Sequence, residues 1–78
     1  MSHQHPPSVV GMRVGAIIKT YCRVYEQQHP GCDIIEVTGV PNLGIYELDA
    51  STMTMSELIK VQRALSIPEH EFSHVFKP

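Results

Sequence analysis

The sequence predicts an all-α fold, a compact domain of five helices. Apolar residues recur at intervals of three and four along the chain, and no stretch reads convincingly as a strand. A Thr-Gly-Val turn at residues 38–40 separates two short apolar-periodic pieces, which is the pattern of two helices joined at a steep angle. The 78 residues make one small domain, and a chain of this size buries only about 60% of the surface that it exposes when unfolded.

The composition favours a single helical domain in the cytosol. Residues 1–8, MSHQHPPS, are polar and without periodicity, so we expect a flexible tail with solvated His3 and His5, followed by one domain at 9–78. No apolar run approaches the roughly 18 residues of a membrane span, and no secretory signal is visible. We therefore expect a cytoplasmic protein without membrane contact, in which Cys22 and Cys32 are reduced and packed.

The first helix is predicted over residues 12–27. Lys19, Arg23 and Glu26 fall together on its solvent side. The sequence His29-Pro30-Gly31 ends it, because proline disfavours helical geometry at the residue before it. Its buried face is predicted to be an apolar stripe at helical spacing: Val14, Ile17, Ile18, Tyr21, Cys22 and Tyr25.

Two short helices are predicted at residues 32–37 and 41–48. Gly39 forms the turn between them, since glycine takes a positive φ without a Cβ clash, and Pro41 suits the first turn of the second helix. Asp33 and Glu36 place negative charge near the N-terminus of the first of the two. The residues expected to be buried between these helices are Ile35, Val40, Ile45 and Leu48.

The fourth and fifth helices are predicted at residues 55–65 and 68–74. Thr54 and Glu57 have the spacing of a capping box, and Ser66 and Pro68 end the fourth helix. The last helix is expected to place Phe72 on the core, together with Val75 or Phe76. The apolar residues of the fourth helix are Leu58, Ile59, Val61, Ala64 and Leu65.

From about residue 14 to residue 72, these elements resemble the Cro/C1-type, lambda repressor-like (XRE) helix-turn-helix domain. The Thr-Gly-Val turn is followed by Ile45 and Leu48 at the spacing of that family. The sequence departs from it at Ile35, where a small Ala is usual, and at Pro41, where Gln or Ser is usual. The closing apolar segment of the family, LxxLxxALxIxxxxF, is matched by Leu58, Val61, Ala64, Leu65, Ile67 and Phe72.

The resemblance implies a small transcriptional regulator of the phage or mobile-element kind that binds operator DNA as a homodimer. The helix that starts near Pro41 would then lie in the major groove with its first residues at the base edges. The expected base contacts are Pro41, Asn42, Leu43, Tyr46 and Glu47. The expected phosphate contacts are Lys19, Arg23, Lys60 and Arg63.

Charge supports an alternative in which the domain binds another protein instead of DNA. The net charge is −2, and residues 24–59 contain six acidic residues and no Lys or Arg. The negative potential of such a segment repels the phosphates of DNA. An exposed surface of Leu43, Tyr46, Met53 and Met55 without basic neighbours would suit a repressor, antitoxin partner or polymerase.

The string His70-Glu71-Phe72-Ser73-His74 matches the H-E-x-x-H motif of zinc proteases. On a helix, the two histidines share a face, and Glu71 would activate water. No third ligand follows, and a domain of this size has no room for a peptide cleft. The sequence therefore predicts a protein that is not an enzyme and has no cofactor or metal, with a last helix that docks through Phe72.

Overall fold

The computed structural model describes residues 9–76, and within them it contains helices and no strand, which confirms the all-α prediction. The predicted tail at 1–8, with His3 and His5, lies outside the described residues. Across residues 9–76, every helix is too short or too polar to cross a membrane. The elements are α1 (Val9–Gln28), α2 (Ile34–Thr38), α3 (Leu43–Tyr46), α4 (Met55–Leu65) and α5 (Glu69–Phe76).

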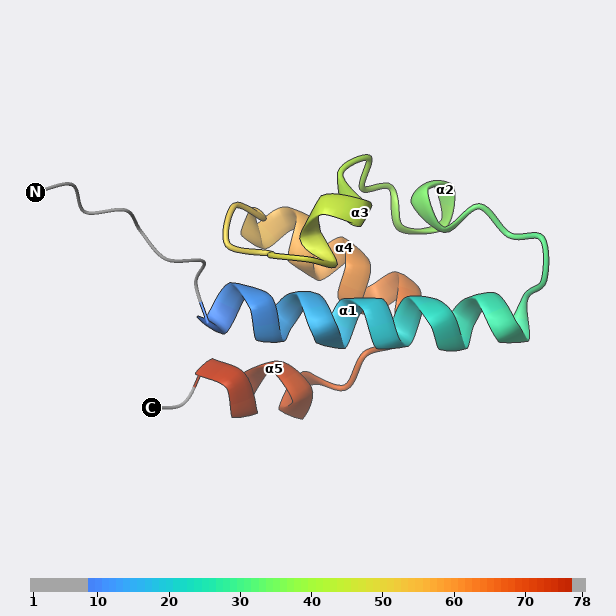
Figure 1. Ribbon diagram of the computed structural model, residues 1–78. Coiled ribbons are helices and arrows are strands. Elements are labelled where there is room, and N and C mark those ends of the chain that lie inside the picture. The colour runs from blue at the N-terminus through green and yellow to red at the C-terminus, as the bar shows by residue number, and fades with distance from the viewer. Residues whose placement is uncertain (1–8, 77–78) are drawn as a thin grey trace, which may run out of the picture.

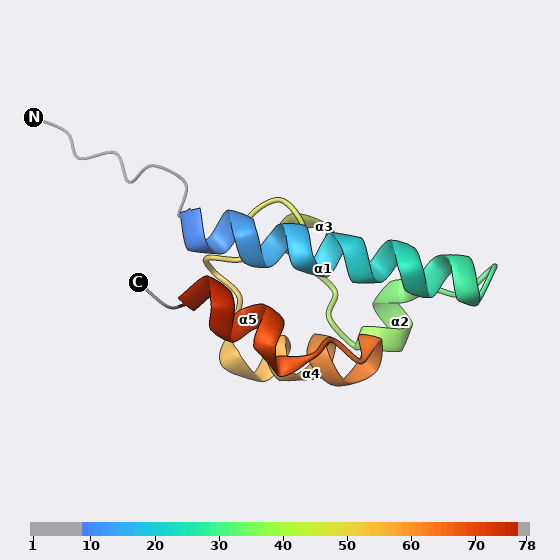
Figure 2. The same cartoon turned by 90° about the horizontal axis from the view of Figure 1, so that it is seen from below.

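Helix α1 is the axis on which the other elements are arranged (Figure 1). Helices α3, α4 and α5 all pack against it, and α2 packs against α4. Helix α5 runs beside the N-terminal half of α1 in both views, whereas α2 lies near the C-terminal end of α1 (Figure 2). The two short helices therefore sit on the side of α1 that α5 does not cover.

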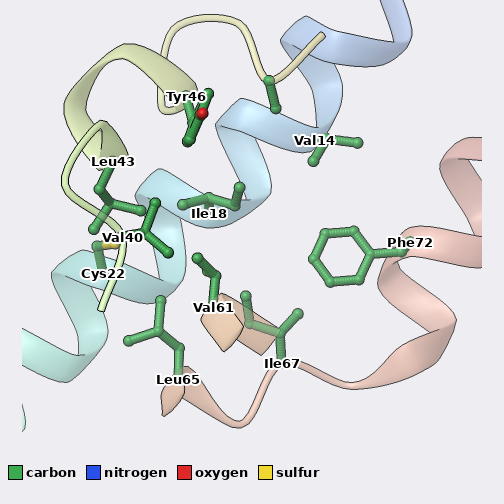
Figure 3. Close-up of a cluster of buried hydrophobic side chains, with 11 residues drawn as sticks. Val14, Ile18, Cys22, Val40, Leu43, Tyr46, Val61, Leu65, Ile67 and Phe72 are labelled. Carbon is green, nitrogen blue, oxygen red and sulfur yellow. The ribbon is translucent and has the colours of Figure 1, made fainter. Parts of the chain in front are cut away.

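The core forms where α1, α3, α4 and α5 meet (Figure 3). The predicted apolar stripe of α1 is confirmed, since Val14, Ile18 and Cys22 are buried and the remaining members are partly buried against them. The closing segment also packs as predicted, with Phe72 buried and Val75 partly buried. The side chain of Phe76 lies outside the described set. The buried apolar residues are Val14, Ile18, Cys22, Val40, Leu43, Tyr46, Ala50, Val61, Leu65, Ile67 and Phe72.

Residues 46–51 cross α1 at very short range, and two glycines allow it. A Cβ at Gly15 would lie 2.5 Å from the carbonyl oxygen of Tyr46, and one at Gly11 would lie 2.8 Å from the backbone nitrogen of Ser51. The backbone N–H of Ala50 donates to the carbonyl of Gly11 at 2.9 Å. Any side chain at these two positions would push the crossing segment away, so the glycines fix the distance between α1 and α3.

The turn between α2 and α3 is confirmed at Gly39, which has φ 71° and caps α2 with its N–H on the carbonyl of Ile35. Asp33 is the N-cap of α2 and accepts from the backbone N–H groups of Ile35 and Glu36. Helix α3 is only four residues long, where the sequence predicted a helix at 41–48. Pro41 and Asn42 lie in the turn before it, and residues 47 and 48 continue as a turn rather than as helix.

Three of the four residues predicted to be buried between α2 and α3 are exposed. Val40 is fully buried, but Ile35, Ile45 and Leu48 are 44%, 62% and 73% exposed. For Ile45 and Leu48, the prediction was wrong because it selected the apolar residues opposite to those that pack on the core. The face that packs carries Leu43 and Tyr46, which are 1% and 5% exposed.

Helices α4 and α5 follow the predicted pattern closely. The capping box of α4 is complete, since the Thr54 side chain accepts from the Glu57 N–H and the Glu57 side chain accepts from the Thr54 N–H. Helix α4 ends at Ser66 in the left-handed conformation, with φ 55°. Of the apolar residues predicted for its packed face, Ile59 is exposed, at 40%.

Candidate interaction surface

Of the five side chains that the sequence assigned to base contacts, Leu43 and Tyr46 are buried, Glu47 is partly buried, and Pro41 and Asn42 are exposed. Leu43 and Tyr46 belong to the core, so they are neither available to a thymine methyl group nor exposed anchors for a protein. This corrects both sequence-based interpretations of these two residues. Pro41 is exposed but has no donor to offer a base edge.

Tyr46 is held by a hydrogen-bond network at the start of α4. Its hydroxyl donates to Oε1 of Glu57 at 2.9 Å, and the same oxygen accepts from the Thr54 backbone N–H at 2.9 Å and from the Thr54 hydroxyl at 3.1 Å. The Thr54 N–H, and next the Tyr46 hydroxyl, hold the pKa of Glu57 below its ordinary value. The hydrogen bond to Glu57 in turn raises the pKa of Tyr46. The network joins α3 to the first turn of α4 and keeps Tyr46 turned inward.

Glu47 and Asn42, the two polar candidates for base reading, also have neighbours inside the domain. Burial raises the pKa of the Cys22 thiol to about 12, and a side-chain hydrogen bond to Glu47 adds to this shift. Glu47, which is partly buried, thus lies near the Cys22 thiol. A side-chain hydrogen bond from Asn42 lowers the pKa of Tyr46, against the larger effect of Glu57, which places the amide beside the Tyr46 hydroxyl.

The outward face of α3 is apolar. Ile45 and Leu48 are among the most exposed large apolar residues of the described chain, and the Leu48 N–H donates to the Ile45 carbonyl at 3.0 Å. Ile45 lies on α3, and Leu48 lies in the turn that directly follows it. We call these two residues the α3 edge. The sequence predicts that both residues are buried, whereas the structure exposes them.

A groove of about 290 Å³ lies where the start of α1 meets the segment that leads into α4. Met53, which is partly buried, and Met55, which is 68% exposed, both line it. None of its lining residues is charged: Val10, Gly11, Val14, Ala50, Ser51, Met53, Thr54, Met55 and Leu58. Of the surface that the sequence proposed for a protein partner, Met53 and Met55 are thus accessible, whereas Leu43 and Tyr46 are not.

The residues predicted to contact phosphate are exposed, but they lie on other helices. Lys19 and Arg23 stand one turn apart on α1, and Lys60 and Arg63 are similarly spaced on α4. Helix α3 itself contains no basic residue. The structure therefore separates the basic side chains from the helix that was expected to read the bases.

The H-E-x-x-H string does not form a protease-like centre. The Tyr21 hydroxyl donates to Oε2 of Glu71 at 2.6 Å, which ties α5 to α1 and occupies the carboxylate that would have to activate water. His70 and His74 are exposed on the outer face of α5. In the part of the chain that is described, no three histidine, cysteine or carboxylate side chains gather as metal ligands.

Comparison with known proteins adds no assignment: no family model, no curated protein and no solved structure matches the chain.

Proposed function

We propose that this protein is a small regulatory domain of the helix-turn-helix kind that acts by binding another protein through the α3 edge. The observation that carries the proposal is the orientation of α3, which buries Leu43 and Tyr46 and leaves Ile45 and Leu48 62% and 73% exposed. Exposed apolar side chains on a short helix and the turn after it are suited to the centre of a protein interface.

The local charge supports the same conclusion. Residues 24–59 contain α2, α3 and the start of α4, and they carry six acidic residues and no Lys or Arg. Much of the affinity for DNA comes from basic side chains that neutralise phosphates, and a negative surface around an apolar edge opposes that contact. A partner protein whose apolar residues have basic neighbours would not be repelled by this negative surface.

The test compares two aspartate substitutions at exposed apolar positions. Leu48→Asp should abolish capture of partner proteins from the source cells, whereas Val24→Asp, at a 44% exposed position on α1, should leave capture intact. Both variants should retain the wild-type melting temperature, because neither side chain is in the core. Equal capture by wild type and Leu48→Asp would refute the proposal.

Operator binding by a homodimer is the second candidate, and the exposure of Lys19, Arg23, Lys60 and Arg63 favours it. Two to four phosphate contacts per subunit would give a salt slope of roughly 2 to 4 for a monomer and about twice that for a dimer. Arg23→Ala should then weaken binding to all duplexes alike, whereas Asn42→Ala should cost about 1 to 3 kcal/mol on the cognate site alone. Failure to bind any duplex at about 50 mM salt would eliminate this candidate.

A further inference from the structure

The outer face of α5 presents two imidazoles on a helix whose orientation is fixed from the other side. Glu71 accepts a hydrogen bond from Tyr21 of α1 at 2.6 Å, Phe72 is buried in the core, and Val75 is partly buried against it. His70 and His74 consequently lie on the face that points away from α1, and both are exposed.

The spacing of these histidines suits one metal ion. Residues four apart on a helix are neighbours, with about 5–6 Å between their Cβ atoms. Imidazole nitrogen is a good ligand for Zn²⁺, Ni²⁺ and Cu²⁺, at about 2.0–2.1 Å in the case of zinc. The helix is already formed and docked, so the two ligands need no folding step to come together.

We propose that His70 and His74 together bind one divalent transition-metal ion on the outer face of α5. Since no third protein ligand gathers there among residues 9–76, water or a second molecule completes the coordination. The site binds metal without the protease chemistry of the motif, because Glu71 is engaged by Tyr21. It is independent of the α3 edge, and it stabilises the folded chain because the ion binds the two imidazoles at helical spacing only while α5 is helical.

The experiment uses Ni²⁺ in two measurements on the full chain with His3→Ala and His5→Ala, because the imidazoles of those two residues would compete for the ion. In NMR spectra, substoichiometric paramagnetic Ni²⁺ should broaden the imidazole signals of His70 and His74 before that of His29, which stacks on Tyr25 at 4.3 Å between ring centroids. In thermal unfolding, millimolar Ni²⁺ should raise the melting temperature of this double variant. His70→Asn and His74→Asn should each remove most of that rise, since either variant leaves a single ligand.

The matched control is His29→Asn, which should keep the full Ni²⁺-dependent rise. Both α5 variants should melt like the double variant without metal, because the side chains are exposed. A loss of about half the rise in each α5 variant would show two independent single-histidine sites and overturn the proposal. Broadening of His29 ahead of the α5 pair would overturn it as well.

Discussion

Leu43 and Leu48 carry the same side chain in opposite environments: Leu43 is 1% exposed, and Leu48, in the turn after α3, is 73% exposed. Leu43→Ala should lower the free energy of unfolding by about 2–5 kcal/mol, because it removes buried methyl groups and leaves a cavity. Leu48→Ala should change it by no more than about 0.5 kcal/mol. Urea unfolding of the two variants measures the difference, and equal losses would contradict the orientation of α3.

Gly39 tests the backbone of the turn in the same way. It has φ 71°, and a Cβ added there would meet no atom within 4 Å, so the cost of a side chain is conformational strain alone. Gly39→Val should destabilise the domain by about 1 kcal/mol or more. Gly44→Ala is the control, since Gly44 is helical and equally open, and this change should stabilise the domain by about 0.5–1 kcal/mol. An unchanged melting temperature for Gly39→Val would be evidence against the turn.

At the scale of elements, the contact between α1 and residues 46–51 depends on the missing side chain of Gly15. Helix propensity alone favours Gly15→Ala by about 1 kcal/mol. The new Cβ would nevertheless lie 2.5 Å from the Tyr46 carbonyl oxygen, and overpacking against backbone costs about 1–3 kcal/mol or more. We expect a net loss of stability in thermal unfolding, opposite in sign to Gly44→Ala. A gain at Gly15 would show that the segment does not lie this close.

The hydrogen bonds that join α3 to α4 should affect how the free energy of unfolding depends on pH in the acid range. The Thr54 N–H and the Tyr46 hydroxyl lower the pKa of Glu57 from its ordinary 4.5, so its stabilising effect is complete above that pH. The effect is lost as the pH falls from 4.5 through the lower folded-state pKa. Glu57→Gln should therefore reduce the loss of stability below pH 4.5, measured as unfolding free energy against pH. An unchanged acid slope in this variant would argue against the network.

For the whole molecule, the fold should not depend on metal. The core is apolar and continuous across α1, α3, α4 and α5, and the described residues bring no three metal ligands together. Treatment with EDTA should leave the helix content measured by circular dichroism unchanged, and the protein should cleave no peptide. Unfolding by the chelator, or cleavage that is lost in Glu71→Gln, would contradict this. If the prediction holds, Ni²⁺ adds stability to a fold that forms without metal.

The elements with strong local signals could be predicted from the amino-acid sequence. The stripe of α1, the αL turn at Gly39, and the capping box of Thr54 and Glu57 all depend on periodicity or on backbone chemistry within a few residues. Such interactions can be predicted from one sequence because the residues that make them are close together in it.

The orientation of α3 follows from packing between segments that are distant in the sequence. Leu43 with Tyr46 and Ile45 with Leu48 are two apolar pairs at the same spacing, so periodicity cannot choose between them. The choice depends on groups outside α3. Gly11 and Gly15 lack side chains and so allow residues 46–51 to pack closely against α1. Glu57 accepts a hydrogen bond from the Tyr46 hydroxyl. The packing of those distant groups turns Leu43 and Tyr46 inward and leaves Ile45 and Leu48 at the surface.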